Sequence, residues 1–195
     1  MNFKTRASGT QIALSVLLIV AIIVADQLTK WLVTEVLLRP ETGMSFGAWL
    51  TATATAPLRD YDVIEVFTGL NLVMVKNTGI SFGMFSSGSN LMPYVLSAMA
   101  LLVSGTLLVW LVFTRRTLLL AALSFIIGGA VGNVIDRLRF GAVIDFVDVY
   151  VQDWHWPAFN LADSSIFIGT FLLLIEVCLK GDGENMRGDV HFPEI

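Results

Sequence analysis

The chain has 195 residues and a formal net charge of −4, and 55% of its residues are hydrophobic while only 14% are charged. Because soluble domains usually carry about 25% charged residues, this composition argues against an ordinary soluble domain and predicts a membrane protein. The small net charge and the absence of a basic stripe argue against a nucleic-acid partner. The single cysteine, Cys178, excludes an intramolecular disulfide and a multi-cysteine metal site.

Four apolar stretches predict four membrane-spanning helices, because a spanning helix needs about 20 residues. They lie at about 12–38, 91–113, 118–138 and 160–179. The first stretch follows Lys4 and Arg6, as the apolar region of a signal peptide would, but a bulky Ile23 stands where a cleavage site needs a small residue. We therefore expect a retained helix and an all-α membrane protein with one membrane-embedded domain over residues 1–195.

The positive-inside rule favours both termini in the cytoplasm, because the short connection between the second and third stretches contains Arg115 and Arg116 and no acid. The segments at about 39–90 and 139–159 are then extracytoplasmic. In the first, β-branched and aromatic residues at 63–75 predict a hairpin on the outer membrane face, and residues 145–151 can add a strand. The aromatic cluster at 154–156 is typical of the lipid–water interface.

Five polar clusters lie within or beside the apolar stretches, and all of them lie toward the same membrane face. A charge at the bilayer centre costs at least about 2.5–3.5 kcal/mol on insertion scales, so each cluster calls for an explanation. Asp26 and Lys30 come late in the first helix, one turn apart, and can pair. Two hypotheses remain for this pair: it neutralises and orients the helix end, or it positions a substrate.

The second polar cluster precedes the second helix. Gly79 permits a tight turn, and the amide of Asn77 can donate to and accept from an extended peptide backbone. Considered alone, this cluster is better explained as a plain turn.

The third cluster closes the third helix. Its three glycines, Gly128, Gly129 and Gly132, predict close helix packing. Asn133, Asp136 and Arg137 follow at spacings that allow a shared helix face. Asp136 beside Arg137 is interpreted as an ionised, paired carboxylate, which suits a structural role better than proton transfer.

The last two clusters each contain an aspartate. Asp145 lies between Ile144 and Phe146, an apolar setting that raises a carboxyl pKa. Asn160 marks the start of the fourth helix, and Asp163 then falls in its first turn, where the helix macrodipole favours an anion. Two carboxylates in unlike environments suit acid–base hydrolysis, although a proton-coupled carrier could use them equally well. A structural membrane subunit would leave the five clusters unexplained.

The sequence lacks the motifs of the competing hydrolases. It contains no H-E-x-x-H and no G-x-S-x-G, which argues against a metalloprotease and a serine hydrolase. The five clusters together resemble the lipoprotein signal peptidase (signal peptidase II) family of bacteria, in order and spacing, over residues 26–163. The matching pieces are Asp26-Gln27-x-x-Lys30, Asn77-x-Gly79-x-x-Phe82, Gly128-Gly129-x-x-Gly132-Asn133-x-x-Asp136-Arg137, Gly141-x-Val143-x-Asp145-Phe146 and Phe159-Asn160-x-Ala162-Asp163.

The resemblance implies an aspartic endopeptidase with Asp145 and Asp163 as its catalytic dyad. The residues implied to bind substrate or support the site are Asp26, Lys30, Asn77, Gly79, Asn133, Asp136, Arg137 and Asn160. It implies diacylglyceryl-modified prolipoproteins as substrates, cut before the lipidated cysteine, with no metal or organic cofactor.

The resemblance also implies a monomer in the bacterial cytoplasmic (inner) membrane, with its active site toward the outer leaflet. The implied fold is four helices with a small extracytoplasmic β-cradle and an extracytoplasmic helical segment. Two features depart from the family pattern. The stretch 39–62 is longer than usual, and Ile80 and Ser81 follow Gly79 where the family commonly has Ala.

Overall fold

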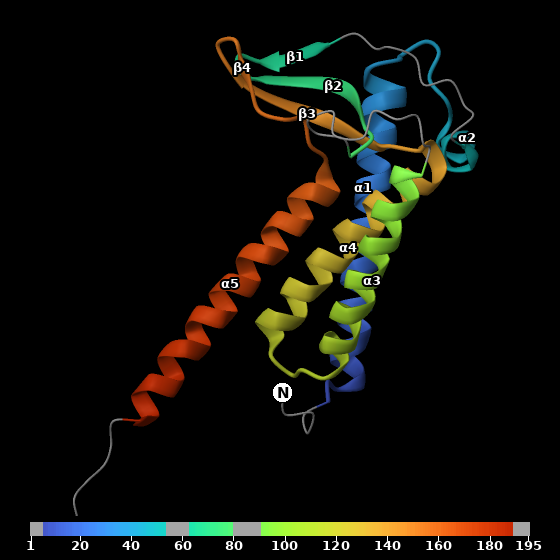
Figure 1. Ribbon diagram of the computed structural model, residues 1–195. Coiled ribbons are helices and arrows are strands. Elements are labelled where there is room, and N and C mark those ends of the chain that lie inside the picture. The colour runs from blue at the N-terminus through green and yellow to red at the C-terminus, as the bar shows by residue number, and fades with distance from the viewer. Residues whose placement is uncertain (1–5, 54–62, 80–90, 189–195) are drawn as a thin grey trace, which may run out of the picture.

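The computed structural model describes residues 6–53, 63–79 and 91–188, with side chains described as far as residue 179. Within these ranges four helices are long and apolar enough to cross a membrane, which confirms the predicted spans (Figure 1). They are α1 (Gly9–Trp31), α3 (Met92–Val112), α4 (Thr117–Phe140) and α5 (Leu161–Gly188). α1 continues without a break into a π-helical segment, Leu32–Leu37. The continuous first span therefore ends one residue before the predicted boundary, whereas α5 extends beyond its predicted end at 179.

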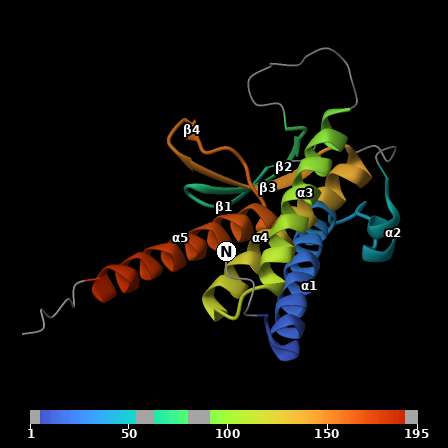
Figure 2. The ribbon, with the colours of Figure 1, turned by 60° about the horizontal axis from the view of Figure 1, so that its bottom comes forward.

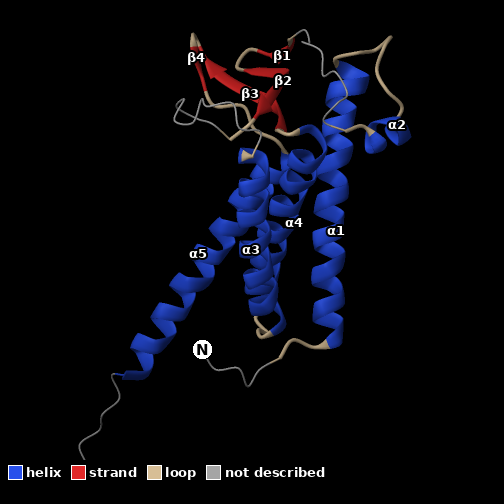
Figure 3. Cartoon of the chain, turned by 45° about the vertical axis from the view of Figure 1, so that its right-hand side comes forward, coloured by secondary structure: helices blue, strands red, loops and turns tan. Residues whose placement is uncertain are grey.

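α4 is the central helix of the bundle, packed against α1, α3 and α5, and α5 tilts away from the other three (Figures 1 and 3). Small residues make this packing possible. A Cβ on Gly129 would lie 2.3 Å from the carbonyl oxygen of Ala162 in α5, and one on Gly132 would lie 2.8 Å from Oδ2 of Asp26 in α1. The close packing expected from the glycines of α4 is therefore present, and it brings the polar ends of three helices together.

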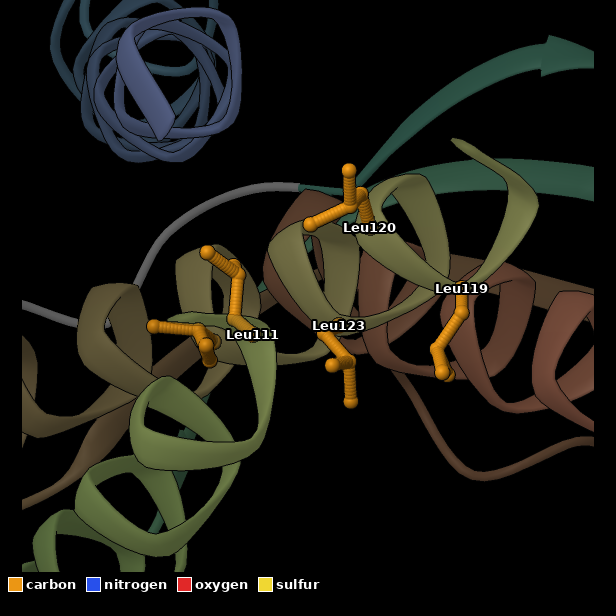
Figure 4. Close-up of a cluster of buried hydrophobic side chains, with 5 residues drawn as sticks. Leu111, Leu119, Leu120 and Leu123 are labelled. Carbon is orange, nitrogen blue, oxygen red and sulfur yellow. The ribbon is translucent and has the colours of Figure 1, made fainter. Parts of the chain in front are cut away.

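Leucine side chains pack together where α3 turns into α4, at the end of the bundle away from the sheet (Figure 4). Leu111 comes from α3, and Leu119, Leu120 and Leu123 come from the first turns of α4. The same end holds Arg6, the first of the described residues, because the side chain of Arg115 donates to its carbonyl. The start of α1 and the basic α3–α4 connection thus lie on one side of the bundle.

A four-stranded antiparallel sheet lies at the opposite end, in the order β1-β2-β3-β4. Its strands are β1 (Ile64–Phe67), β2 (Leu70–Asn77), β3 (Val143–Val151) and β4 (Trp154–His155). The predicted hairpin is confirmed as β1 and β2, and the predicted strand is β3, which begins two residues earlier than expected. The register places Val75 of β2 beside Asp145 of β3, so the end of β2 and the start of β3 reach the bundle together.

A short helix, α2 (Phe46–Thr51), lies on the other side of this end of the bundle from the sheet (Figure 2). Its Trp49 is fully buried, and the guanidinium of Arg139 lies 4.3 Å from the centroids of both the Trp49 and Phe140 rings. Arg139 also donates to the backbone carbonyls of Trp49 and Ala52. α2 is a helical segment of the kind that the resemblance implies, and Arg139 fastens it to the end of α4. Residues 54–62 of the longer stretch lie outside the described residues.

Candidate active site

Asp145 and Asp163 are brought together by the side chain and backbone of one residue, Asn160. The Asn160 side-chain nitrogen donates to Oδ1 of Asp145 at 2.7 Å, and its backbone N–H donates to Oδ2 of Asp163 at 3.2 Å. Asn160 Oδ1 accepts from the backbone N–H of Asp163 at 2.9 Å, which is the hydrogen bond of a helix N-cap. The residue predicted to start the fourth helix therefore also links the two predicted catalytic carboxylates.

Each carboxylate has a second amide donor from another element. Asn77, the last residue of β2, donates to Oδ2 of Asp145 at 3.0 Å, and Asn133 of α4 donates to Oδ1 of Asp163 at 2.8 Å. Gly79 follows at φ +80°, where its N–H donates to Asn77 Oδ1 at 2.9 Å. Four oxygens thus receive four amide hydrogen bonds, while Ile80, Ser81 and Phe82 of the same motif lie outside the described residues.

A buried ion triad lies below the dyad, between α1 and α4. Lys30 Nζ is 2.8 Å from Oδ2 of Asp26 and 2.6 Å from Oδ2 of Asp136, and all three side chains are fully buried. Gln27 donates to both carboxylates, at 3.2 Å and 2.9 Å. The predicted Asp26–Lys30 pair is confirmed. Because both side chains are fully buried, they contact only other protein groups and cannot touch a substrate in this conformation.

The two acids of the triad hold the backbone immediately before each aspartate of the dyad. Asp26 Oδ1 accepts from the N–H of Ala162 at 3.0 Å, and Asp136 Oδ2 accepts from the N–H of Ile144 at 3.2 Å. Ala162 precedes Asp163, and Ile144 precedes Asp145. Lys30 therefore contacts both of the acids whose hydrogen bonds hold the backbone of α5 before Asp163 and the backbone of β3 before Asp145.

One predicted pairing was wrong in its partner. Asp136 was expected to pair with its neighbour Arg137, but the cation in contact with it is Lys30 of α1. Successive residues on a helix point about 100° apart, so Asp136 faces α1 while Arg137 points elsewhere. Arg137 instead interacts electrostatically with Asp163 and Asp145 as well as with Asp136. Among the described residues, no acceptor hydrogen-bonds its buried Nε.

The environment of Asp145 favours its neutral form. Burial raises its pKa from 3.8 to about 6, and the charge of Asp163 acts in the same direction. Hydrogen bonds from Asn77 and Asn160 and the charge of Lys30 act in the opposite direction and are outweighed. The upward shift expected from the apolar neighbours of Asp145 is thus present, with burial as its main cause.

Asp148 belongs to a different cluster, although it lies on the same strand as Asp145. An odd separation along a strand puts the two side chains on opposite faces, and Asp148 is within hydrogen-bond distance of His155 Nδ1, at 2.9 Å, and accepts from Asn71 at 3.0 Å. Burial acts to raise the pKa of Asp148, but these hydrogen bonds and the charge of His155 outweigh it and lower the pKa. Asp148 therefore has the environment of an ionised structural carboxylate.

Two side chains of the site were not among the predicted residues. Gln27 accepts from Arg139 at 2.9 Å while it donates to the triad, so it connects the α2 anchor to the buried charges. Gln27 stands in the first matching piece of the sequence and is a polar residue inside an apolar span, but it was given no role. Arg139 had no such signal, because an arginine at a helix end is ordinary. In the part of the chain that the structure describes, no group of three or more His, Cys, Asp or Glu side chains could hold a metal ion.

Comparisons with known proteins show the family to which the chain belongs. The family described as Signal peptidase (SPase) II matches residues 18–179. A lipoprotein signal peptidase of Alteromonas mediterranea is 40% identical over 154 residues, 73% of this chain and 85% of that protein. One from Acinetobacter baumannii is 36% identical over 156 residues, 79% of this chain and 77% of that protein. A solved structure described as a bacterial membrane enzyme superposes with a TM-score of 0.61 at 26% identity and covers 98% of both chains. The chain belongs to the signal peptidase II family, the lipoprotein signal peptidases, which are aspartic peptidases of the membrane.

Proposed function

We propose that Asp145 and Asp163 are the catalytic dyad of this peptidase and that they cut prolipoproteins carrying a diacylglyceryl group, just before the lipidated cysteine. The observation that carries the proposal is the linkage of both carboxylates by Asn160 at the junction of α4, β3 and α5. Asp145, whose pKa is about 6, is the group that holds the shared proton, and Asp163 is the group that receives the proton of the attacking water.

In the first step, Asp163 takes a proton from water as the water oxygen attacks the scissile carbonyl carbon. Asp145 gives its proton to the carbonyl oxygen, so a neutral tetrahedral diol forms. When the diol collapses, the C–N bond breaks, the leaving nitrogen takes the proton from Asp163, and Asp145 recovers its own proton. Water is consumed, its two hydrogens end on the new amine and on the new carboxyl group, and both aspartates regain their starting protonation states.

The other site residues act around the dyad. Asn77, Asn133 and Asn160 orient the carboxylates through the hydrogen bonds described above. Arg137 and Gly79 border the substrate, the arginine through a guanidinium that the described residues leave partly unsatisfied. The support residues are Asp26, Lys30 and Asp136, which position the start of α5 and of β3.

We further propose that the sheet and dyad face the outer leaflet of the bacterial inner membrane and that the enzyme acts as a monomer. The basic α3–α4 connection lies at the opposite end, where the positive-inside rule puts the cytoplasm. A cysteine at Thr68, in the β1–β2 turn and in a Cys178→Ser background, is expected to react with a membrane-impermeant maleimide added outside intact spheroplasts. Labelling only after lysis would contradict this orientation.

Cleavage of a diacylglyceryl prolipoprotein by the purified, membrane-reconstituted enzyme tests the dyad. We expect Asp145→Asn and Asp163→Asn each to slow cleavage by roughly 10²–10⁴-fold, the range of general acid–base catalysis. Asp148→Asn is the matched control, since it removes the same charge from the same strand, and we expect near wild-type cleavage. Full activity of either dyad variant, with its insertion intact, would show that a different pair of groups does the chemistry.

A further inference from the structure

A groove of about 540 Å³ runs beside the start of α5. Its lining comes from the connection after β4 and from one side of α5: Trp156, Phe159, Asp163, Ser164, Phe167 and Ile168. Four of these six side chains are large and apolar, and the lining also includes Asp163 of the dyad. The sheet overlies this end of α5 (Figure 1), so the groove begins at the reacting groups and is bordered there by aromatic side chains.

The other end of the groove opens toward lipid. Phe167 is 74% exposed and Ile168 is 44% exposed, on a helix apolar enough to cross the membrane. One and two turns further along α5, Phe171 and Leu174 are exposed as well. A side of α5 with this composition faces hydrocarbon, so the groove joins the dyad to the interior of one leaflet.

The size of the groove distinguishes between the two apolar parts of the substrate. A helix is at least about 10 Å across with its side chains and so fills about 80 Å³ per ångström of length, and 540 Å³ would hold little more than one turn of it. The membrane-spanning part of a signal peptide is therefore too bulky for this groove. An acyl chain, which is a single file of methylenes, is narrow enough to enter it lengthwise.

We propose that the groove holds an acyl chain of the substrate's diacylglyceryl group and sets the preference of the enzyme for acyl-chain length. The inference rests on the proposed function, because the diacylglyceryl group is carried by the cysteine next to the scissile bond. With the scissile carbonyl at the dyad, that group leaves the site within a few atoms of Asp163. A groove that starts at Asp163 and opens into lipid gives one of its chains a continuous apolar path.

The test measures kcat/KM for one prolipoprotein peptide whose diacylglyceryl group carries either two octanoyl or two palmitoyl chains, in the same detergent. Phe167→Ala removes a wall of the groove, and Ile168→Trp fills it. We expect each variant to lower the ratio of long-chain to short-chain kcat/KM by roughly tenfold, the scale at which apolar pockets discriminate. Phe171→Ala is the matched control, because Phe171 is similarly exposed on α5 but does not line the groove, and its ratio should equal that of the wild type.

A second pair of substrates separates this inference from its alternatives. If the variants respond to the length of the signal peptide's apolar region and not to the acyl chains, the groove holds the signal peptide and the inference is wrong. If neither length matters, the groove holds bulk lipid and the inference is equally wrong. Failure of the proposed function looks different, since Asp163→Asn would then cleave both substrates at the wild-type rate.

Discussion

Asp26 accepts a hydrogen bond from the backbone N–H of Ala162 at 3.0 Å and so joins the first spanning helix to the residue that precedes Asp163. The matching bond from Ile144 to Asp136 holds the residue that precedes Asp145. Lys30 contacts both Asp26 and Asp136. This buried cation therefore sets the distance between the start of α5 and the start of β3, the two segments that carry the dyad. The geometry of the dyad therefore depends on side chains that do not reach the substrate.

Replacing Lys30 by Met should destabilise the protein and abolish cleavage. The variant leaves two buried carboxylates facing each other, and loss of one partner of a buried ion pair costs roughly 3–5 kcal/mol. Thermal unfolding in detergent and the cleavage rate measure the two effects. Lys76→Met, at an exposed position on β2, is the control and should change the unfolding temperature little. Equal effects of the two substitutions would show that the triad has no special role.

Replacing Asn160 by Ser should separate helix capping from catalysis. Serine caps a helix about as well as asparagine, so the start of α5 should remain stable, but the amide that donates to Asp145 at 2.7 Å is lost. We expect a lower kcat, with a loss of stability limited to the hydrogen bonds that the same amide donates to Asn133 and to the carbonyl of Ile144. Asn160→Ala, which loses the cap as well, should lose roughly 0.5–2 kcal/mol in addition. A serine variant with wild-type kcat would mean that this hydrogen bond does not orient the dyad.

The fall of kcat/KM at high pH should move to higher pH when Asn77 is replaced by Ala. The protonated form of Asp145 is the active one, so kcat/KM falls as pH rises through its pKa of about 6. The hydrogen bond from Asn77 lowers that pKa by stabilising the anion. Its removal therefore raises the pKa and shifts the fall to higher pH, which a pH profile of kcat/KM measures.

Asn71→Ala provides the control for the pH profile. Asn71 lies on the same strand and donates to Asp148 at 3.0 Å, the same distance that separates Asn77 from Asp145. Its loss should leave the fall of kcat/KM at the same pH. A shift of equal size in both variants would indicate a general change in the sheet, and a downward shift for Asn77→Ala would contradict Asp145 as the acid.

A methyl group on Gly129 should impair catalysis more than folding in the membrane. The added Cβ would lie 2.3 Å from the carbonyl oxygen of Ala162, so the start of α5 must move. Displacement of a catalytic group by about 1 Å can cost roughly 100-fold in rate. Gly105→Ala on α3, where nothing lies within 4 Å of the new Cβ, should leave the rate unchanged. Cleavage at wild-type rate by Gly129→Ala would show that α5 tolerates the shift.

The spans and the raised pKa of Asp145 could be predicted from the sequence because their signals are local, whereas the pairing of Asp145 with Asp163 as a dyad was implied by the family resemblance. A stretch of about 20 apolar residues predicts a spanning helix by its length alone. An aspartate between Ile144 and Phe146 predicts a carboxyl group that is removed from water and therefore has a raised pKa. The N-cap at Asn160 was also visible, since capping depends on a residue and its next turn. These features are set within a few positions of the chain.

The partners of the buried charges could not be predicted in the same way. Lys30 could be paired with Asp26 by helical spacing, but its contact with Asp136 depends on how α1 packs against α4. Arg139 could not be distinguished from an ordinary interfacial arginine until Trp49 was seen beneath it. These contacts depend on how separate helices pack together, which cannot be predicted from the spacing of residues along one helix.

The triad also has a consequence for how the chain enters the membrane during synthesis. α1 carries Asp26 and Lys30 as an internal ion pair at 2.8 Å, so the first span can be released into the bilayer as a charge-balanced unit while the rest of the protein is still on the ribosome. The acid of α4, Asp136, is in contact with the cation of another helix, Lys30 of α1. When α1 enters the membrane before α4, the cation is therefore already present when Asp136 arrives, and packing of the two helices leaves none of the three charges without an opposite charge.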